Sequence, residues 1–193
     1  LHIGGNDIGF SGIAENCFST SPSGSVCQGQ YVVDGVDRVS ARIQEAGTRV
    51  AAVLSGIKAR APQARVLVLN YPAIFPHEGG GCWPLLPVAE GDVPWLRAKQ
   101  VELNQMLAAQ AAAAGAVLVD VYAASRGRDA CAPPLLRWVE PLIPVHAGAP
   151  VHPNLTGMLG MADLVIAKAA APRPTAQSLV GTTTTLVRTL LPR

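Results

Sequence analysis

The sequence predicts an α/β fold, in which a parallel β-sheet is covered by helices on both faces. Long segments of helical periodicity alternate along the chain with short, continuous apolar runs. This order is typical of parallel strands joined by helical crossovers, and uninterrupted apolar runs are typical of strands buried on both faces. Ligands of such sheets bind beyond the carboxyl ends of the strands, so motifs in the loops at that edge are the candidate site.

The first long helix is expected from about Tyr31 to Ala61, where Val, Ile and Leu recur every three or four residues. Pro62 ends this helix, and Gly47 is a point at which it can bend or divide. The run RVLVLNYP at positions 65–72 is then predicted to contain a buried strand, because it is short, apolar and bounded by prolines.

The middle of the chain is predicted to contain a loop, a helix and a second strand. The segment 73–94 is rich in Gly and Pro and is expected to be a long surface loop. A second helix is expected over Trp95–Ala114, with Gly115 at its carboxyl end. The run AVLVDV at positions 116–121 is predicted to be the second buried strand.

The last third of the chain is predicted to be irregular from Ala123 to Val151 and then helical. Asn154 is the expected N-cap of this final helix, since its side chain can accept from the first free N–H groups. Residues 171–193 are rich in Thr and Pro and have no clear period, so no structure is assigned to this tail. We therefore predict one domain over residues 1–170.

Composition excludes several classes of partner. Of the 193 residues, 49% are hydrophobic. The chain contains 15 Lys and Arg and 13 Asp and Glu, which gives a net charge of +2. This balance gives no basic surface of the kind that nucleic acids or anionic membranes require. The most apolar stretch, residues 108–124, is interrupted by Gln110, Gly115 and Asp120, so a stable membrane span is not expected.

The chain contains four cysteines, Cys17, Cys27, Cys82 and Cys131. No C-x-x-C pair and no His at ligand spacing accompany them, so we do not expect a zinc site. We favour the pairing Cys17–Cys27, which closes a loop rich in Ser, Gly and Pro, with Cys82–Cys131. The alternative is four buried reduced thiols. Disulfides indicate a secreted or extracytoplasmic protein.

The segment GGND at positions 4–7 follows a very short apolar lead-in. Its two glycines allow a sharp turn after a strand, and Asn6 can then project its amide into a cleft. Such an amide is a suitable donor to the oxyanion that develops in acyl transfer. The alternative is an ordinary turn in which Asn6 and Asp7 bond only the local backbone.

The segment VHPN at positions 151–154 places His152 before a proline and a helix. A histidine fixed there, with a pKa near neutral, can act as a general base. The alternative is a surface histidine. The other three histidines, His2, His77 and His146, have no comparable setting and are expected to be structural or surface residues.

Together, GGND and HPN-x-x-G resemble two of the four signature blocks of the SGNH hydrolases, the family of GDSL esterases and lipases. The Cys17–Cys27 loop, ARAPQARVLVLNYPAIFP, and LNQMLAAQAAAAGAVLVDV with its following Cys-containing loop are similar to the secreted bacterial lipase-like branch. The resemblance covers roughly residues 1–170. It implies a three-layer α/β/α, flavodoxin-like SGNH fold with a parallel sheet, incomplete at its N-terminus.

The resemblance also implies roles for individual residues. Asn6 would be the oxyanion donor, Gly5 would permit its turn, and His152 would be the base. In this family the nucleophilic Ser lies in an upstream Gly-Asp-Ser block and a second block supplies a Gly N–H, and the 193 residues contain neither. Family members commonly have Asp three residues before the His, where this chain has Ala149, although some orient the imidazole with a main-chain carbonyl.

The implied function is hydrolysis of small-molecule or lipid esters by Ser-His chemistry, with the serine outside this chain and the 193 residues alone inactive. The first alternative is a non-catalytic binding or structural module that kept the fold and lost the nucleophile. The second is a nucleotide-binding α/β protein, for which GGND followed by a Cys-bearing loop is a poor phosphate turn. The oligomeric state is left open.

Overall fold

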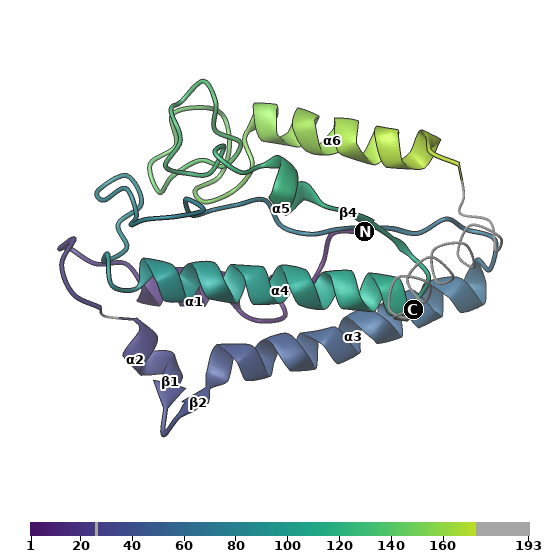
Figure 1. Ribbon diagram of the computed structural model, residues 1–193, viewed down its shortest axis with the longest axis horizontal. Coiled ribbons are helices and arrows are strands. Elements are labelled where there is room, and N and C mark those ends of the chain that lie inside the picture. Colours follow the sequence, from purple (N-terminus) through teal and green to yellow (C-terminus); the bar gives the residue numbers. More distant parts are fainter. Residues whose placement is uncertain (26, 173–193) are drawn as a thin grey trace, which may run out of the picture.

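A parallel sheet between helical layers forms the centre of the molecule (Figure 1). The computed structural model describes residues 1–25 and 27–172, so most of the predicted tail lies outside the described residues. In chain order the elements are α1 (Phe10–Asn16), α2 (Gln28–Tyr31), β1 (Val32–Val33), β2 (Val36–Asp37), α3 (Arg38–Arg60), β3 (Leu67–Leu69), α4 (Val93–Ala113), β4 (Val117–Val119), α5 (Val121–Ala124) and α6 (Leu155–Ala170).

The sheet is built around β3. On one side β3 pairs in parallel with β4, with Val68 opposite Leu118. On the other side the main-chain nitrogen of Leu1 donates to the Leu67 carbonyl at 2.8 Å, and the Leu69 N–H donates to the Leu1 carbonyl at 2.9 Å. This is the parallel pattern, so Leu1 lies in a third strand position. The parallel sheet and the strand-like lead-in before GGND are as predicted.

Helices cover both faces of this sheet. Figure 1 shows α6 on one side of β4 and the pair α3–α4 on the other, and both α4 and α6 contact β3 and β4. The α4 side buries an aliphatic cluster of Val50, Leu54, Val68, Leu107 and Ala111. The three-layer α/β/α arrangement is therefore confirmed. No helix of the described part of the chain is long and apolar enough to span a membrane.

The predicted start of the first long helix is wrong. An antiparallel hairpin of β1 and β2 stands where that helix was expected to begin. Asp34 and Gly35 join its strands with φ of 52° and 75°, the left-handed conformations that a tight hairpin turn needs. The Asp37 carboxylate then accepts from the Val39 and Ser40 N–H groups and starts α3 one residue later.

Three further boundaries differ from prediction. Residues 10–16 form α1, a helix that was not predicted. Helix α4 begins at Val93 rather than Trp95, because Pro94 fits the first turn of a helix, where no N–H bond is lost. Strand β4 stops at Val119, because Asp120 turns to cap α5 and accepts from the Ala123 N–H at 3.1 Å.

Gly47 does not divide α3, which runs unbroken to Arg60. A Cβ at this position would lie only 3.1 Å from the Met106 Cγ of α4. The glycine therefore serves the close approach of α3 and α4 rather than a bend.

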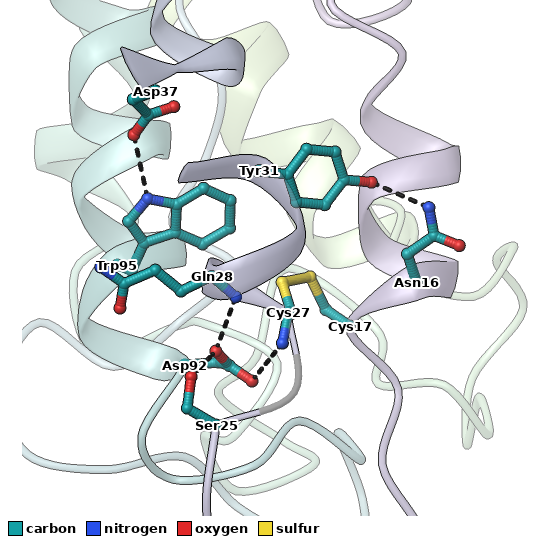
Figure 2. Close-up of a disulfide and its surroundings, with 9 residues drawn as sticks. All are labelled: Asn16, Cys17, Ser25, Cys27, Gln28, Tyr31, Asp37, Asp92 and Trp95. Atoms are coloured by element: carbon teal, nitrogen blue, oxygen red, sulfur yellow. Dashed lines mark hydrogen bonds between the residues drawn. A yellow bond between two sulfur atoms is a disulfide. The ribbon is translucent and has the colours of Figure 1, made fainter. Parts of the chain in front are cut away.

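The structure joins Cys17 to Cys27 and Cys82 to Cys131, the pairing favoured from the sequence, and leaves no free cysteine. Figure 2 shows how Asp92 anchors the first disulfide. The buried Asp92 carboxylate accepts from the N–H groups of Cys27 and Gln28, both at 3.0 Å, and from the Ser25 hydroxyl. The small disulfide loop is thereby tied to the start of α4.

The loop that follows β3 is held to α4 by two buried amide side chains one helical turn apart. Gln100 accepts from the Ile74 N–H at 3.1 Å and donates to the Pro72 carbonyl at 2.6 Å. Asn104 accepts from the Tyr71 N–H at 2.8 Å and donates to the Tyr71 carbonyl at 3.0 Å. These side chains satisfy main-chain groups that have no strand partner, so the loop has one defined path.

Replacing Gln100 by Leu is expected to lower the free energy of unfolding by about 2–4 kcal/mol, because it leaves a buried N–H and a buried carbonyl without partners. Denaturant titration measures this difference. The matched control is Gln105→Leu, an exposed position of the same helix, expected to change stability by less than about 0.5 kcal/mol. Equal stability of the two variants would contradict the role given to Gln100.

Candidate active site

The GGND turn lies at the carboxyl end of the strand formed by Leu1–Ile3 and is fixed by Tyr71. The Gly5 N–H donates to the Tyr71 hydroxyl at 2.8 Å. A Cβ on Gly5 would also lie 2.8 Å from that oxygen, so a larger residue would displace the tyrosine. Gly4, with φ of 108°, supplies the turn that precedes this contact. Asn6 follows at an exposed position.

Short antiparallel contacts between residues 138–140 and 151–154 place His152. The Glu140 N–H donates to the His152 carbonyl at 3.0 Å, and the Val151 N–H donates to the Glu140 carbonyl at 3.1 Å. Val151 has φ of 58°, a conformation that costs a β-branched residue energy and that surrounding structure must therefore enforce. The turn that carries His152 is thus held on both sides of the histidine.

The imidazole of His152 is oriented by a main-chain carbonyl. Its Nδ1 lies 2.8 Å from the Pro150 oxygen. Because a carbonyl only accepts, Nδ1 carries the hydrogen, and in the neutral ring Nε2 keeps its lone pair. An imidazole held in this tautomer can accept a proton at Nε2.

Two acidic residues, Asp7 beside the GGND turn's Asn6 and Asp120 after β4, have partners other than His152. Asp7 pairs with Arg49 at 3.4 Å, and Asp120 accepts from the Asn70 side chain and caps α5. The orientation of His152 by the Pro150 carbonyl instead matches the alternative that the sequence raised for a chain with Ala149 at the acidic position.

A buried carboxylate, Glu140, organises the loop around His152. The Glu140 side chain is 0% exposed and accepts from the N–H groups of Val145 and His146, from His146 Nδ1 at 3.0 Å and from Asn154 Nδ2 at 2.6 Å. Burial raises the pKa of Glu140, but the hydrogen bonds from Asn154, Val145 and His146 outweigh it and lower the pKa to about 2. Sequence reasoning missed this residue.

Asn154 links Glu140 to α6. Its Oδ1 accepts from the Gly157 N–H at 2.9 Å, which makes it the predicted N-cap, while its Nδ2 donates to the Arg137 carbonyl and to Glu140. His146, expected to be structural or a surface residue, has a structural role here, because it bonds the buried carboxylate.

The two sequence motifs meet in one cavity of about 130 Å³, which Gly5, Asn6 and His152 all line. His2 lines it as well, with its ring centroid 4.3 Å from that of Tyr71, and burial lowers the pKa of His2. His2 was expected to be structural or a surface residue. Its closeness to the GGND turn in the sequence is the feature from which a place in the cavity wall could have been predicted. The apolar part of the wall consists of Phe10, Ile74, Leu103, Val139 and Val151, with Pro72 and Pro153.

No described residue lining this cavity is Ser, Thr or Cys. Ser125 is fully buried, and its hydroxyl accepts from the Ala73 N–H at 2.8 Å and donates to the Tyr122 carbonyl at 3.1 Å. It therefore serves the packing of α5 against the loop after β3. Across residues 1–25 and 27–172, no three His, Cys, Asp or Glu side chains gather as a metal site.

The chain is thus an α/β protein in which a histidine and an asparagine line one cavity at the carboxyl edge of the sheet. The model of the GDSL-like lipase/acylhydrolase family matches residues 1–159. Lipase 2 of Streptomyces coelicolor is 40% identical over 169 residues, which cover 84% of this chain and 56% of that protein. Lipase 1 of the same organism is 27% identical, covering 83% and 55%. The chain belongs to the GDSL-like lipase/acylhydrolase family, as its motifs predicted.

Solved structures agree with this assignment. The crystal structure of phospholipase A1 from Streptomyces albidoflavus NA297 superposes with a TM-score of 0.62 at 26% identity, covering 89% of this chain and 67% of that one. An extracellular lipase from Streptomyces rimosus gives 0.57 at 25% identity, covering 84% and 66%. The chain spans about half the length of the curated relatives that it matches.

Acid is expected to weaken the loop around Glu140. Because the folded-state pKa of Glu140 lies below its ordinary value of 4.5, its contribution to stability is complete above about pH 5 and is lost as the pH falls toward 2. The loss through this group is on the order of 3 kcal/mol, measured by denaturant titration across that range.

Glu140→Gln is expected to remove this part of the pH dependence and to lower the free energy of unfolding at neutral pH by about 2–4 kcal/mol, since an amide NH₂ then faces donors. The exposed Glu78→Gln serves as the control, with the pH profile of the unmodified protein. A Glu140→Gln profile that still falls as steeply between pH 5 and 2 would refute the role of this carboxylate.

Proposed function

We propose that this chain carries the general base and an oxyanion donor of a serine ester hydrolase, and that the serine comes from a polypeptide segment preceding Leu1. The observation that carries the proposal is that Asn6 and His152 line one cavity, with the tautomer of His152 leaving Nε2 free to accept a proton. Membership in a lipase and acylhydrolase family supports the reaction class.

In the proposed reaction, His152 Nε2 takes the proton of the serine hydroxyl as its oxygen attacks the ester carbonyl carbon. The carbonyl oxygen becomes an oxyanion, to which Asn6 Nδ2 donates. Collapse of this intermediate breaks the bond to the alcohol, which leaves with the proton held by His152. Water, deprotonated by the same imidazole, then releases the acid and restores the serine.

Neither a metal nor an organic cofactor takes part in this route. The cavity wall of Phe10, Ile74, Leu103, Val139 and Val151 suits the acyl part of an ester better than a charged group. The substrate class proposed is a small-molecule or lipid ester, which the names of the relatives, two lipases and a phospholipase A1, support.

We place the protein outside the cytoplasm. Both disulfides are of the kind that persists in an oxidising compartment, and one structural relative is named as an extracellular lipase.

A second candidate function is a binding or structural module that retains the fold without catalysis. It is favoured by one observation, the absence of Gly-Asp-Ser from the 193 residues. The two candidates differ in a single requirement, a nucleophile supplied from outside this chain.

The test uses the polypeptide encoded by the complete reading frame, assayed with p-nitrophenyl esters. We expect His152→Ala to lower kcat by roughly 10³-fold or more, because the serine loses its base, and Asn6→Ala to lower it by about 10²–10³-fold, because one oxyanion donor is lost. The 193-residue chain alone is expected to be inactive.

His77→Ala is the matched control, since this histidine is exposed and does not line the cavity, and it should leave kcat unchanged. Turnover that survives His152→Ala would disprove the base. A complete polypeptide that hydrolyses no ester would favour the non-catalytic module.

A further inference from the structure

A second, smaller cavity borders the cavity of the candidate site. It measures about 10 Å³, against about 130 Å³ for the cavity beside His152, and is lined by the apolar side chains of Ile8, Ile13, Val39 and Leu96 and by Lys99. Three further side chains line both cavities and therefore separate them. We call these side chains, Phe10, Gln100 and Leu103, the partition.

The partition is held in place by the residues around it. Gln100 is buried, and both ends of its amide are bonded to the main chain of the loop after β3. Leu103 is only 2% exposed. Phe10 begins α1, and its N–H donates to the Gly5 carbonyl at 3.2 Å, so its main chain is tied to the turn that carries Asn6. The partition therefore has a defined position relative to the candidate oxyanion donor.

The cavity beside His152 has room for a short acyl group only. Pockets that hold a drug-sized ligand measure about 300–1,000 Å³. The volume here, about 130 Å³, is instead close to that of an apolar cavity of about 150 Å³ that takes one benzene molecule, a group of about six carbon atoms. Because the amide of Gln100 bonds the main chain, the partition faces the cavity with the apolar side chains of Phe10 and Leu103 and a satisfied amide.

We propose that the partition is the end of the acyl pocket and that Phe10 limits this pocket to acyl groups of about six carbons. This inference rests on the proposed ester hydrolysis and narrows its substrates to esters of short acids. A longer chain would leave its last methylenes in water, and each methylene that is not buried weakens binding by about fourfold. Phe10 is the specificity-determining residue of the partition, because it is only partly buried, whereas Gln100 and Leu103 hold α4 in the core.

The test is kcat/KM of the polypeptide of the complete reading frame for p-nitrophenyl butyrate, hexanoate, octanoate and decanoate, each below the concentration at which it aggregates. We expect the highest value at hexanoate or a shorter ester, and a value lower by about 10-fold or more at decanoate.

Phe10→Ala removes the phenyl ring and joins the two cavities. The maximum should then move to octanoate or decanoate, and the ratio of kcat/KM for decanoate to that for butyrate should rise by about 10-fold or more. Because the ratio compares two substrates of one sample, it does not depend on the fraction of folded enzyme. Phe10→Leu is the milder variant, for use if thermal unfolding shows that Phe10→Ala prevents folding, and should raise the ratio by about threefold.

The matched control is Phe18→Ala. Phe18 is partly buried against the same apolar core as Phe10 but lines neither cavity, so this variant should keep the ratio of the unmodified polypeptide. A maximum at octanoate or decanoate in the unmodified polypeptide, a ratio that Phe10→Ala leaves unchanged, or an equal rise in Phe18→Ala would each overturn the proposal.

The outcome is separable from that of the proposed function. Binding of hexanamide and octanamide to the same polypeptide, measured by isothermal titration calorimetry, needs no turnover. The unmodified polypeptide should bind hexanamide at least as tightly as octanamide, whereas Phe10→Ala should bind octanamide about 10-fold more tightly than hexanamide. This pattern without hydrolysis of any ester would overturn the proposed catalysis and leave the pocket in place. Tighter binding of octanamide by the unmodified polypeptide would overturn the limit set by Phe10, even if esters are hydrolysed.

Discussion

The hydrogen bond from the Gly5 N–H to the Tyr71 hydroxyl is the contact on which the geometry of the site depends most. It joins the turn after the first strand position to the loop after β3, two segments far apart in the sequence. Tyr71 is itself fixed through its main chain by Asn104 of α4. The position of Asn6 therefore follows from the packing of α4 on the sheet, rather than from local turn preferences alone.

The other half of the site depends on a second buried polar group. Glu140 satisfies donors from the loop before His152 and from the cap of α6, and its main chain brackets His152. Inside a protein, satisfied polar networks of this kind specify one arrangement, since each unpaired group would be costly. Two buried polar clusters, one under each motif, thus bring an asparagine and a histidine into one cavity although 145 positions separate Asn6 from His152.

The sequence carried the features that have a local signature. Apolar runs gave β3 and β4, Asn154 was recognisable as a helix cap, and the two motifs indicated the family. Features that depend on tertiary contacts could not be predicted from the sequence. The valines at positions 32 and 36 fit a helical period, yet Asp34 and Gly35 form a hairpin turn there. Glu140 shows no periodicity, and only its burial in the folded chain reveals what it does.

For the candidate site, the residues of the two motifs could be predicted from the sequence. The residues that hold these motifs in place could not. Gly5, Asn6 and His152 stood out because their two motifs together resemble signature blocks of one family, and their proximity in one cavity was an expectation from strand-end topology. Tyr71, Glu140 and His2 stand in segments that were predicted to be strand, loop or surface. Their contacts are made with residues more than ten positions away or depend on burial. Local sequence patterns predict neither of these.

The central proposal is that this chain supplies the base and the oxyanion donor, and that the nucleophilic serine lies outside it. Its most direct test is to map where a fluorophosphonate reacts. The polypeptide of the complete reading frame is labelled, digested and analysed by mass spectrometry, with the His152→Ala variant alongside. We predict one adduct, on a serine in a Gly-Asp-Ser sequence preceding Leu1, that is lost in the variant. An adduct on a serine within the 193 residues, or no adduct at all, would contradict the proposal that this chain supplies the base and the oxyanion donor to a serine outside it.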